Sequence, residues 1–259
     1  MKIARYQTPN AVRIGRLEGD KVRDMGTDLF AHMQVFGQIH DLDQVRLLAP
    51  LVPRKIVGVG HNYREHALEM GREPSAWPDL FLKPATAVIG PDDAIEIPAI
   101  SQQVEIEAEL AVVVGRVLRD ATVEEAASAV LGYTCINDVT ARDLQRTDRC
   151  WARAKGHDTF APLGPCIVTD IDPSNLLVES YINGQRKQYA RTRQMLHSVP
   201  ELLAYISTVM TLEPGDVVAT GTPAGVAQIH PGDVVEVVID GIGRLRNPVV
   251  ERAPSPQIA

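Results

Sequence analysis

The sequence predicts an α+β fold that is mainly β, with a small β-rich domain preceding a larger one. Three features of the 259-residue chain support this prediction. Residues 1–52 contain short strand candidates, residues 104–115 form a nearly continuous apolar run, and the last third alternates strand candidates with Asn-Gly and Pro-Gly-Asp turns. A segment with prolines at positions 50 and 53 marks the boundary, so we predict domains at residues 1–52 and 53–259.

The composition narrows the range of partners. The chain carries 26 Lys and Arg against 33 Asp and Glu, a net charge of −7, which disfavours nucleic acid and anionic membranes as partners. A hydrophobic content of 45% and a charged content of 23% are typical of a soluble globular protein. The three cysteines include no Cys-x-x-Cys pair, and the first residues lack the apolar core of a signal peptide. We therefore expect a cytoplasmic location.

The first part of the chain contains strand candidates and no cluster of groups suited to catalysis. These candidates cover residues 3–6, 12–17 and 21–25. The next predicted strand, at residues 55–59, leads into a Gly-x-Gly pair. A dinucleotide-binding loop needs a third glycine, and Tyr63 occupies that position, which argues against a Rossmann fold. The serine-hydrolase, zincin and P-loop sequence patterns are also absent.

A short helix is predicted after this strand, with Asn62 as its N-cap and Gly71 at its end. His66 and Glu69 are three residues apart and therefore lie on one face of that helix. A carboxylate beside an imidazole raises its basicity and fixes its tautomer, as in a general base. A surface His/Glu pair would have the same spacing, so both interpretations stay open. His61, at the turn before the helix, suits a structural role as well as a functional one.

The apolar run at residues 104–115, VEIEAELAVVVG, predicts one buried strand. Because successive side chains on a strand point to opposite faces, Glu105, Glu107 and Glu109 share one face. Buried carboxylates repel one another, and a hard cation such as Mg²⁺, Mn²⁺ or Ca²⁺ would offset that repulsion. A solvated face with ordinary surface glutamates is the alternative. At roughly 3.3 Å per residue the outer two glutamates are about 13 Å apart, so only neighbours can share an ion.

Four other polar positions have unusual surroundings. Lys83 lies in an apolar setting, where a lysine either reaches the surface or is held inside for an anion. Asp138 interrupts an apolar strand and is either a turn residue or a ligand. His157, beside an aspartate in a loop, is more often hydrogen-bonded than a ligand. The glycines of GTPAGV free backbone N–H groups to approach an anion, and Thr222 adds a hydroxyl.

The remaining elements follow from capping and turn signals. A capping box at Thr122 and Glu125 opens an Ala-rich helix, and Asn183-Gly184 connects the two strands of a hairpin. A second capping box at Ser198 opens a helix whose apolar face comprises Leu202, Leu203, Ile206, Val209 and Met210. The predicted spans are residues 122–131 for the first helix, 177–182 and 185–189 for the hairpin, and 217–220 and 234–239 for two further strands.

Six segments of the chain together resemble the fumarylacetoacetate hydrolase (FAH) family. In order they are GVGHNYREHALEMG, PDLFLKP, VEIEAELAVVVGR, NDVTARDLQ, AKGHDTFAPLGP and LEPGDVVATGTPAGV. The resemblance runs from about residue 53 to the C-terminus, and six motifs in order are far more specific than any one of them. It implies an FAH-type mixed β-sandwich or β-roll catalytic domain, one Mg²⁺ or Mn²⁺ per chain, and a homodimer.

The resemblance also implies roles for single residues. It places the metal ligands at Glu107, Glu109 and Asp138, and it leaves Glu105 without a ligand role. The implied catalytic residues are His66, Glu69 and Lys155. The implied substrate-binding residues are Arg142, Thr222 and Lys83. His61 and His157 stand where we expect other residue types, and the sequence does not assign them a role.

The members of this family hydrolyse C–C bonds in β-diketo acids, decarboxylate oxaloacetate-like acids or isomerise dienedioates from aromatic catabolism. The resemblance therefore implies a metal-dependent hydrolase that cleaves a C–C bond in an acylpyruvate-type acid through a metal-bound enolate, with a small 2-oxo or β-diketo acid as its substrate. An isomerase or decarboxylase of 2-hydroxyhepta-2,4-diene-1,7-dioate-type or oxaloacetate-type acids is the first alternative. A non-catalytic metal-binding protein on the same fold is the second, and intact His66, Glu69 and Lys155 argue against it.

Overall fold

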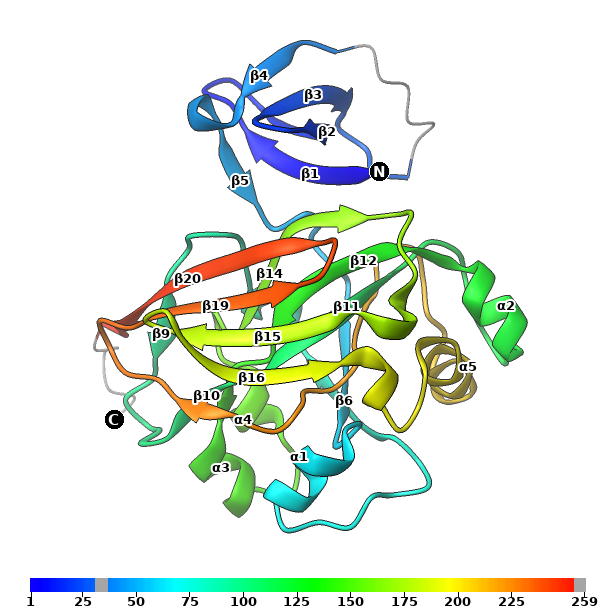
Figure 1. Cartoon of the computed structure of the whole chain (residues 1–259), viewed down its shortest axis with the longest axis vertical. Helices are drawn as coiled ribbons and strands as arrows, with labels where there is room; N and C mark the ends of the chain where they lie inside the picture. The colour runs from blue at the N-terminus through cyan, green and yellow to red at the C-terminus, as the bar shows by residue number, and fades with distance from the viewer. Residues whose placement is uncertain (31–36, 254–259) are drawn as a thin grey trace, which may run out of the picture.

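The structure is a computed structural model that describes residues 1–30 and 37–253. Its described part is mostly β with a few short helices, which confirms the prediction of a mainly β α+β fold. Figure 1 shows a small group of N-terminal strands above a larger body, in which two layers of strands lie one in front of the other. The last six residues of the predicted second domain, 254–259, lie outside the described residues.

The N-terminal strands extend the central sheet of the larger body. The predicted strands are present as β1 (Lys2–Gln7), β2 (Val12–Glu18) and β3 (Lys21–Gly26). Two three-residue strands were not predicted, β4 (Ile39–Asp41) and β5 (Arg46–Leu48). Lys2 and Ile3 of β1 pair antiparallel with β14 (Ala161–Val168), which joins this group to the rest of the chain. The domain division at residue 52 stays a prediction.

The central sheet collects strands from the whole length of the chain. Its order is β4-β3-β2-β1-β14-β12-β11-β17-β6-β7, with β5 beside β1 and β8 beside β14. Its strands in the larger body, besides β14, are β6 (Ile56–Gly60), β7 (Asp79–Lys83), β8 (Val88–Ile89), β11 (Ala108–Val114), β12 (Val130–Asn137) and β17 (Val217–Ala219). β6 and β17 pair in parallel, so Gly58 lies beside Ala219. β11 lies between β12 and β17 and is buried on both faces, as its apolar sequence predicts.

A second sheet packs on β11 and β12 and closes the main core. Its order is β16-β15-β19-β20-β9. The strands are β9 (Ile95–Ile97), β15 (Leu177–Ile182), β16 (Gln185–Arg191), β19 (Val234–Ile239) and β20 (Gly243–Glu251). The predicted hairpin is present, with Asn183 (φ 50°) and Gly184 (φ 77°) in the left-handed conformation that its two-residue turn requires. Val178 and Val237 of this sheet share a buried cluster with Leu110 of β11.

The predicted single strand at residues 104–115 is interrupted at Glu107, so this part of the prediction is wrong. β10 (Val104–Ile106) leaves the central sheet and forms a small sheet with β13 (Thr140–Ala141) and β18 (Ala227–Gln228). The register is the same on both sides of the interruption, because Ala108 pairs with Asn137 and Glu105 pairs with Thr140. The two paired segments therefore bend together, one at Glu107 and the other at Asp138.

Short helices lie along the edges of the larger body, and one 3₁₀ helix lies among the N-terminal strands (Figure 1). The α-helices are α1 (Arg64–Glu69), α2 (Val123–Ser128), α3 (Arg142–Thr147), α4 (Ala152–Lys155) and α5 (Val199–Val209), and the 3₁₀ helices are η1 (Leu42–Gln44), η2 (Ala85–Ala87), η3 (Pro173–Asn175) and η4 (Thr192–Gln194). The capping box of α2 is present, since Thr122 and Glu125 exchange hydrogen bonds of 2.8 and 3.2 Å. The predicted apolar face of α5 is only partly buried, because Val209 is 57% exposed.

Asn62 is not the N-cap of α1, contrary to the prediction. Tyr63 occupies the N-cap position, and no side chain caps the helix there. The Asn62 side-chain amide instead donates to the backbone carbonyls of Thr220 (2.8 Å) and His197 (3.1 Å), which ties the start of α1 to the segment after β17. Among the described residues, no helix combines the length and apolar character needed to span a membrane.

Candidate active site

The shared bend of the two strands brings three carboxylates together. Asp138 directly follows β12, and its backbone N–H donates to the Glu107 carbonyl at 2.9 Å. Glu109 is two residues further along the chain, on β11. In the described part of the chain, Glu107, Glu109 and Asp138 each offer one carboxylate oxygen, and these oxygens lie within 4.8 Å of one another. All three residues are buried, so the interpretation as solvated surface glutamates is wrong. We call these three residues the carboxylate group.

Cationic side chains lie against two members of the carboxylate group. Lys155 donates to Glu107 at 2.8 Å and to Asp138 at 2.5 Å. Lys83 donates to the other carboxylate oxygen of Asp138 at 2.5 Å, and Arg142 forms a hydrogen-bonded ion pair with Glu107. Burial opposes ionisation of Glu107, but the charges of Lys155 and Arg142 outweigh it and hold the pKa of Glu107 well below its ordinary value.

Glu109 is the member of the carboxylate group that no cationic side chain contacts within the described residues. Its carboxylate accepts a hydrogen bond from the Gly221 N–H at 2.8 Å. Burial raises the pKa of Glu109 well above its ordinary value, and the negative charges of Asp138 and Glu107 raise it further. A divalent cation would offset this repulsion, and a set of carboxylate oxygens is what Mg²⁺ and Mn²⁺ prefer. The residues present therefore fit such an ion.

Glu105 lies outside the carboxylate group, the position that the family resemblance implies for it. One of its oxygens accepts a hydrogen bond from Arg142 Nε at 2.7 Å, and the other accepts one from the Gln103 side chain at 2.5 Å. Glu105 therefore fixes the guanidinium of Arg142, whose other nitrogens bind Glu107 and Gln145.

His66 and Glu69 form a hydrogen-bonded pair on α1. His66 is only 4% exposed and its Nδ1 lies 3.1 Å from a Glu69 oxygen, while the Glu69 side chain is 32% exposed, so the pair extends from the surface to a buried imidazole. The other Glu69 oxygen accepts a hydrogen bond from the Gly225 N–H at 3.0 Å. Burial opposes the charge of Glu69, but the hydrogen bonds from His66 and Gly225 outweigh it and lower the pKa of Glu69. A carboxylate at Nδ1 favours the tautomer with the proton there and leaves Nε2 as the basic nitrogen.

Most of the predicted site residues line one small cavity. Seven of them do so: His66, Glu107, Glu109, Asp138, Arg142, Lys155 and Thr222. His61 also lines it, and its Nδ1 is 2.9 Å from a carboxylate oxygen of Asp79. Phe81 and Trp151 form an aromatic wall, with ring centroids 5.4 Å apart. Glu69 and Lys83 do not line this cavity; Glu69 contacts it through His66, and Lys83 lies behind Asp138.

The GTPAGV segment binds anions, as its glycines predict, but these anions are carboxylates of the chain itself. Gly221 donates to Glu109, and Gly225 donates to Glu69. Both glycines have positive φ (97° and 98°), and a Cβ at Gly225 would lie 2.4 Å from a backbone oxygen. The Thr222 hydroxyl donates to the Ala108 carbonyl at 2.9 Å, so its oxygen is fixed at the cavity wall.

Two glutamines of this site were not predicted from the sequence. Gln145 lines the cavity and accepts a hydrogen bond from Arg142 at 2.5 Å. Its position three residues after Arg142 on α3 was a usable signal. Gln188 is fully buried on β16, and its amide donates to Thr222 Oγ1 and to the Pro223 carbonyl, both at 2.7 Å. Nothing in the local sequence distinguishes Gln188 from a surface residue of the hairpin.

Lys83 and His157 lie apart from the cavity lining. Lys83 is buried and donates to Asp138 and to the Val139 carbonyl. These contacts suit a residue that positions Asp138. Substrate binding by Lys83 stays a prediction. His157 packs edge-on against Phe160, and its Nε2 has no hydrogen-bond partner among the described residues.

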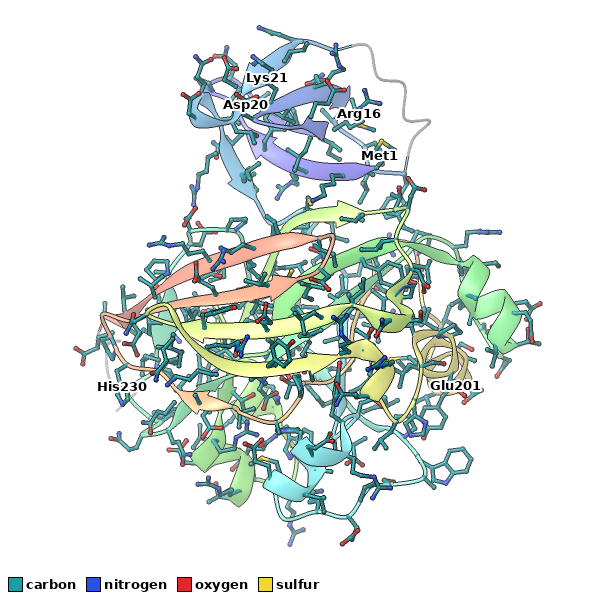
Figure 2. The ribbon with its side chains drawn as sticks, viewed as in Figure 1. Met1, Arg16, Asp20, Lys21, Glu201 and His230 are labelled. Atoms are coloured by element: carbon teal, nitrogen blue, oxygen red, sulfur yellow. The ribbon has the colours of Figure 1, made fainter. Side chains whose placement is uncertain are left out.

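Replacing Lys83 with Met should destabilise the fold. The change removes one partner of a buried ion pair and leaves Asp138 with less compensation, which typically costs about 3–5 kcal/mol. The measurement is urea denaturation followed by circular dichroism. Lys21→Met is the matched control: Lys21, labelled in Figure 2, forms an exposed ion pair with Asp41, and loss of this pair should be undetectable. Equal stability of the two variants would contradict the prediction.

Comparisons with known proteins agree with this architecture. Residues 55–250 match the family described as fumarylacetoacetate (FAA) hydrolase C-terminal, and residues 1–50 match one described as Rv2993c-like, N-terminal. The solved 2-hydroxyhepta-2,4-diene-1,7-dioate isomerase from Mycobacterium marinum is 44% identical, with a TM-score of 0.91 over 98% of this chain and 100% of that one.

Two further relatives carry different activities in their names. The maleylpyruvate hydrolase from Sphingobium sp. SYK-6, solved with manganese(II) and pyruvate, is 31% identical, with a TM-score of 0.81 over 98% of this chain and 100% of that one. The mitochondrial oxaloacetate tautomerase fahd2 of Xenopus laevis is 42% identical over 80% of this chain and 69% of its own. The match over residues 55–250 covers well over half of the sequence. The chain belongs to the fumarylacetoacetate hydrolase family.

Proposed function

We propose that this protein is a divalent-cation-dependent hydrolase that cleaves a C–C bond in a β-diketo acid of the acylpyruvate type. The observation that carries the proposal is the position of His66. It lines the same cavity as the carboxylate group and is oriented by Glu69. A base held in this way next to an electrophilic centre suits the activation of water.

Glu107, Glu109 and Asp138 would hold one Mg²⁺ or Mn²⁺ per chain. Such an ion would supply Lewis-acid chemistry, compensating the negative charge that develops on a 2-oxo group. The maleylpyruvate hydrolase relative, solved with manganese(II) and pyruvate, supports this assignment.

The other residues of the cavity would bind and orient the substrate. Arg142 and Gln145 present N–H donors for the carboxylate of a 2-oxo acid, and the Thr222 oxygen lies at the same wall. The Lys155 ammonium would stabilise an enolate oxygen as the C–C bond breaks. His66 Nε2 would take a proton from water, and Glu69 would stabilise the imidazolium that results.

An isomerase, tautomerase or decarboxylase is the second candidate function. The names of the Mycobacterium marinum and Xenopus laevis relatives favour it, and His66 can also move a proton between two carbon atoms without attack by water. The test is to add Mg²⁺ and compare turnover of an acylpyruvate, oxaloacetate and a 2-hydroxydienedioate. Release of pyruvate from the acylpyruvate supports the hydrolase. Conversion of only the other two substrates supports the second candidate, and inactivity toward all three supports a non-catalytic metal-binding protein.

We also propose that the protein is a cytoplasmic homodimer. This proposal is based on its membership of the family. Light scattering at micromolar concentration should give twice the chain mass of 28.3 kDa. A monomer under these conditions would contradict this proposal without affecting the assignment of the site.

A further inference from the structure

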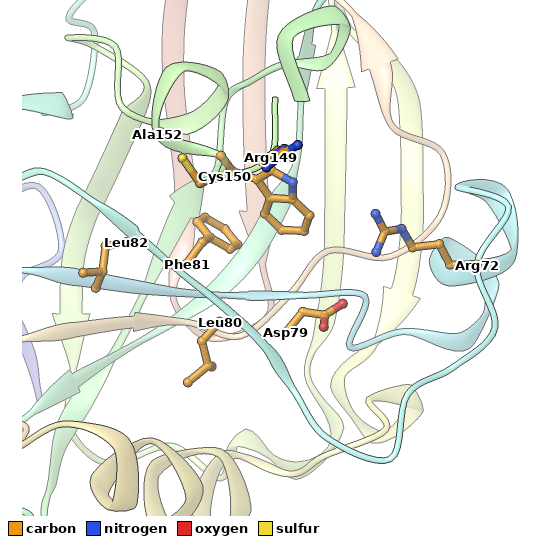
Figure 3. A pocket seen from close by; sticks show the side chains of 9 residues that line it. Arg72, Asp79, Leu80, Phe81, Leu82, Arg149, Cys150 and Ala152 are labelled. Carbon is orange, nitrogen blue, oxygen red and sulfur yellow. The ribbon is translucent and has the colours of Figure 1, made fainter. Parts of the chain in front are cut away.

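A larger cavity lies next to the one that holds the carboxylate group. Its volume is about 520 Å³, and Phe81 and Trp151 line both cavities, so the two meet at this aromatic pair. We call the larger one the outer cavity. Figure 3 shows Phe81 among its other lining side chains, which include Leu80, Leu82 and Cys150. The outer cavity thus offers apolar side chains together with three charged ones, Arg72, Arg149 and Asp79, to any group that extends beyond the inner cavity.

Two arginines line the outer cavity, Arg72 and Arg149; both are exposed, and they come from different parts of the chain (Figure 3). Among the described residues, neither guanidinium takes part in a hydrogen bond or an ion pair. Arg153 and Arg142 nearby are both paired with carboxylates. Asp79, the acidic residue of the outer cavity, forms a hydrogen bond with His61 and not with either arginine. Two guanidinium groups beside an apolar wall suit a carboxylate at the end of a short carbon chain.

The backbone around both arginines links them to the predicted catalytic residues. Gly71 ends α1 with φ 69°, and the N–H groups of Gly71 and Arg72 donate to Leu68 (3.0 Å) and Ala67 (2.8 Å). This Schellman motif fixes the Arg72 backbone relative to His66 on the same helix. Arg149 is in the segment that leads into α4, which ends at Lys155. Arg72 also affects the inner cavity, which His61 lines. Burial is the main cause that lowers the pKa of His61, and the positive charge of Arg72 lowers it further.

We propose that Arg72 and Arg149 form a subsite for the distal carboxylate of a dicarboxylic 2-oxo acid, whose 2-oxo end occupies the inner cavity. This inference rests on the proposed function and narrows it to dianionic substrates. An acid with a neutral end would fill the inner cavity but leave both guanidinium groups without a partner. The subsite therefore selects substrates by the charge at their far end.

The test separates binding from turnover. With Mn²⁺ present, calorimetry should show that the wild type binds 2-oxoadipate more tightly than 2-oxobutyrate. The Arg72→Met/Arg149→Met double variant should lose at least about tenfold in affinity for 2-oxoadipate and keep its affinity for 2-oxobutyrate. Single variants should each lose part of this preference, and Arg149→Lys should retain some of it. Arg153→Met is the matched control, because Arg153 is exposed, paired with Asp148 and outside the outer cavity, and it should leave both affinities unchanged.

The inference is overturned if the wild type shows no preference for 2-oxoadipate, or if the double variant keeps the wild-type preference. Equal losses for both acids would also overturn it, because they would indicate a general disturbance of the site. The proposed function fails separately, if the wild type binds 2-oxoadipate through the arginines but releases no pyruvate from any acylpyruvate.

Discussion

Glu107→Gln and Asp138→Asn are each expected to abolish metal binding and turnover together. Each change removes one of three carboxylates whose oxygens lie within 4.8 Å of one another. Removal of a group that only orients a metal ligand typically costs 10–100-fold in metal affinity, so loss of a ligand should cost more than about 100-fold. Titration of the metal-free protein with Mn²⁺, followed by calorimetry and by activity, measures both effects.

Glu105→Gln is the control for this prediction. Glu105 is buried on the same stretch of chain, but it binds Arg142 and Gln103 and lies outside the carboxylate group. We expect its Mn²⁺ affinity to stay within a few-fold of the wild type. Circular dichroism should show that the variants remain folded. Full Mg²⁺-dependent turnover in Glu107→Gln or Asp138→Asn would refute the assignment, and a large loss in Glu105→Gln would shift the site toward the N-terminus.

His66→Ala should abolish hydrolysis and leave metal binding intact. His66 lines the cavity but is not part of the carboxylate group, and a general base of this kind contributes about 10²–10⁴-fold in rate. Glu69→Gln should cause a smaller loss, because Glu69 only orients the imidazole and stabilises its charged form. The measurement is kcat for an acylpyruvate, together with Mn²⁺ affinity for each variant.

The same variant distinguishes the two candidate functions. Decarboxylation relies on charge stabilisation by the cation and Lys155, so oxaloacetate decarboxylation should suffer less than acylpyruvate cleavage in His66→Ala. His157→Ala is a suitable control, because His157 does not line the cavity. Should His66→Ala cleave the acylpyruvate at the wild-type rate, His66 is not the base that activates water.

Local sequence patterns predicted part of the strands and the starts of α2 and α5, but not the start of α1 or the strands β14 and β20. The Asn183-Gly184 turn and the Thr122 capping box are formed by adjacent residues, so the sequence contains all the information they need. The interruption of the strand at Glu107 could not be predicted in this way. VEIEAELAVVVG alternates correctly for one strand, and the bend depends on partners from β13 and β18, which are far away in sequence.

The contact between His66 and Glu69 was predictable, because residues three positions apart on one helix lie on the same face. Contacts between segments that are distant in the sequence were not predictable in this way. Asn62 has the residue type of an N-cap, but the backbone of Thr220 and His197 competes for its amide. Gln188 reaches Thr222 from another sheet, and Lys83 finds Asp138 inside the core. Each of these contacts joins residues more than 30 positions apart, and no pattern in one segment reveals the partner.

The parallel pairing of β6 with β17 determines when the cavity can form during folding. It joins residue 58 to residue 219, and closing a loop of that length costs on the order of 4–5 kcal/mol in chain entropy before the contacts compensate. Pairings of such long range slow folding. During synthesis from the N-terminus, α1 and β11 are complete long before Gly221 and Thr222 leave the ribosome. The carboxylates of Glu109 and Glu69 therefore lack their backbone donors, the N–H groups of Gly221 and Gly225, until late in synthesis. The cavity is completed only when the C-terminal third of the chain has folded.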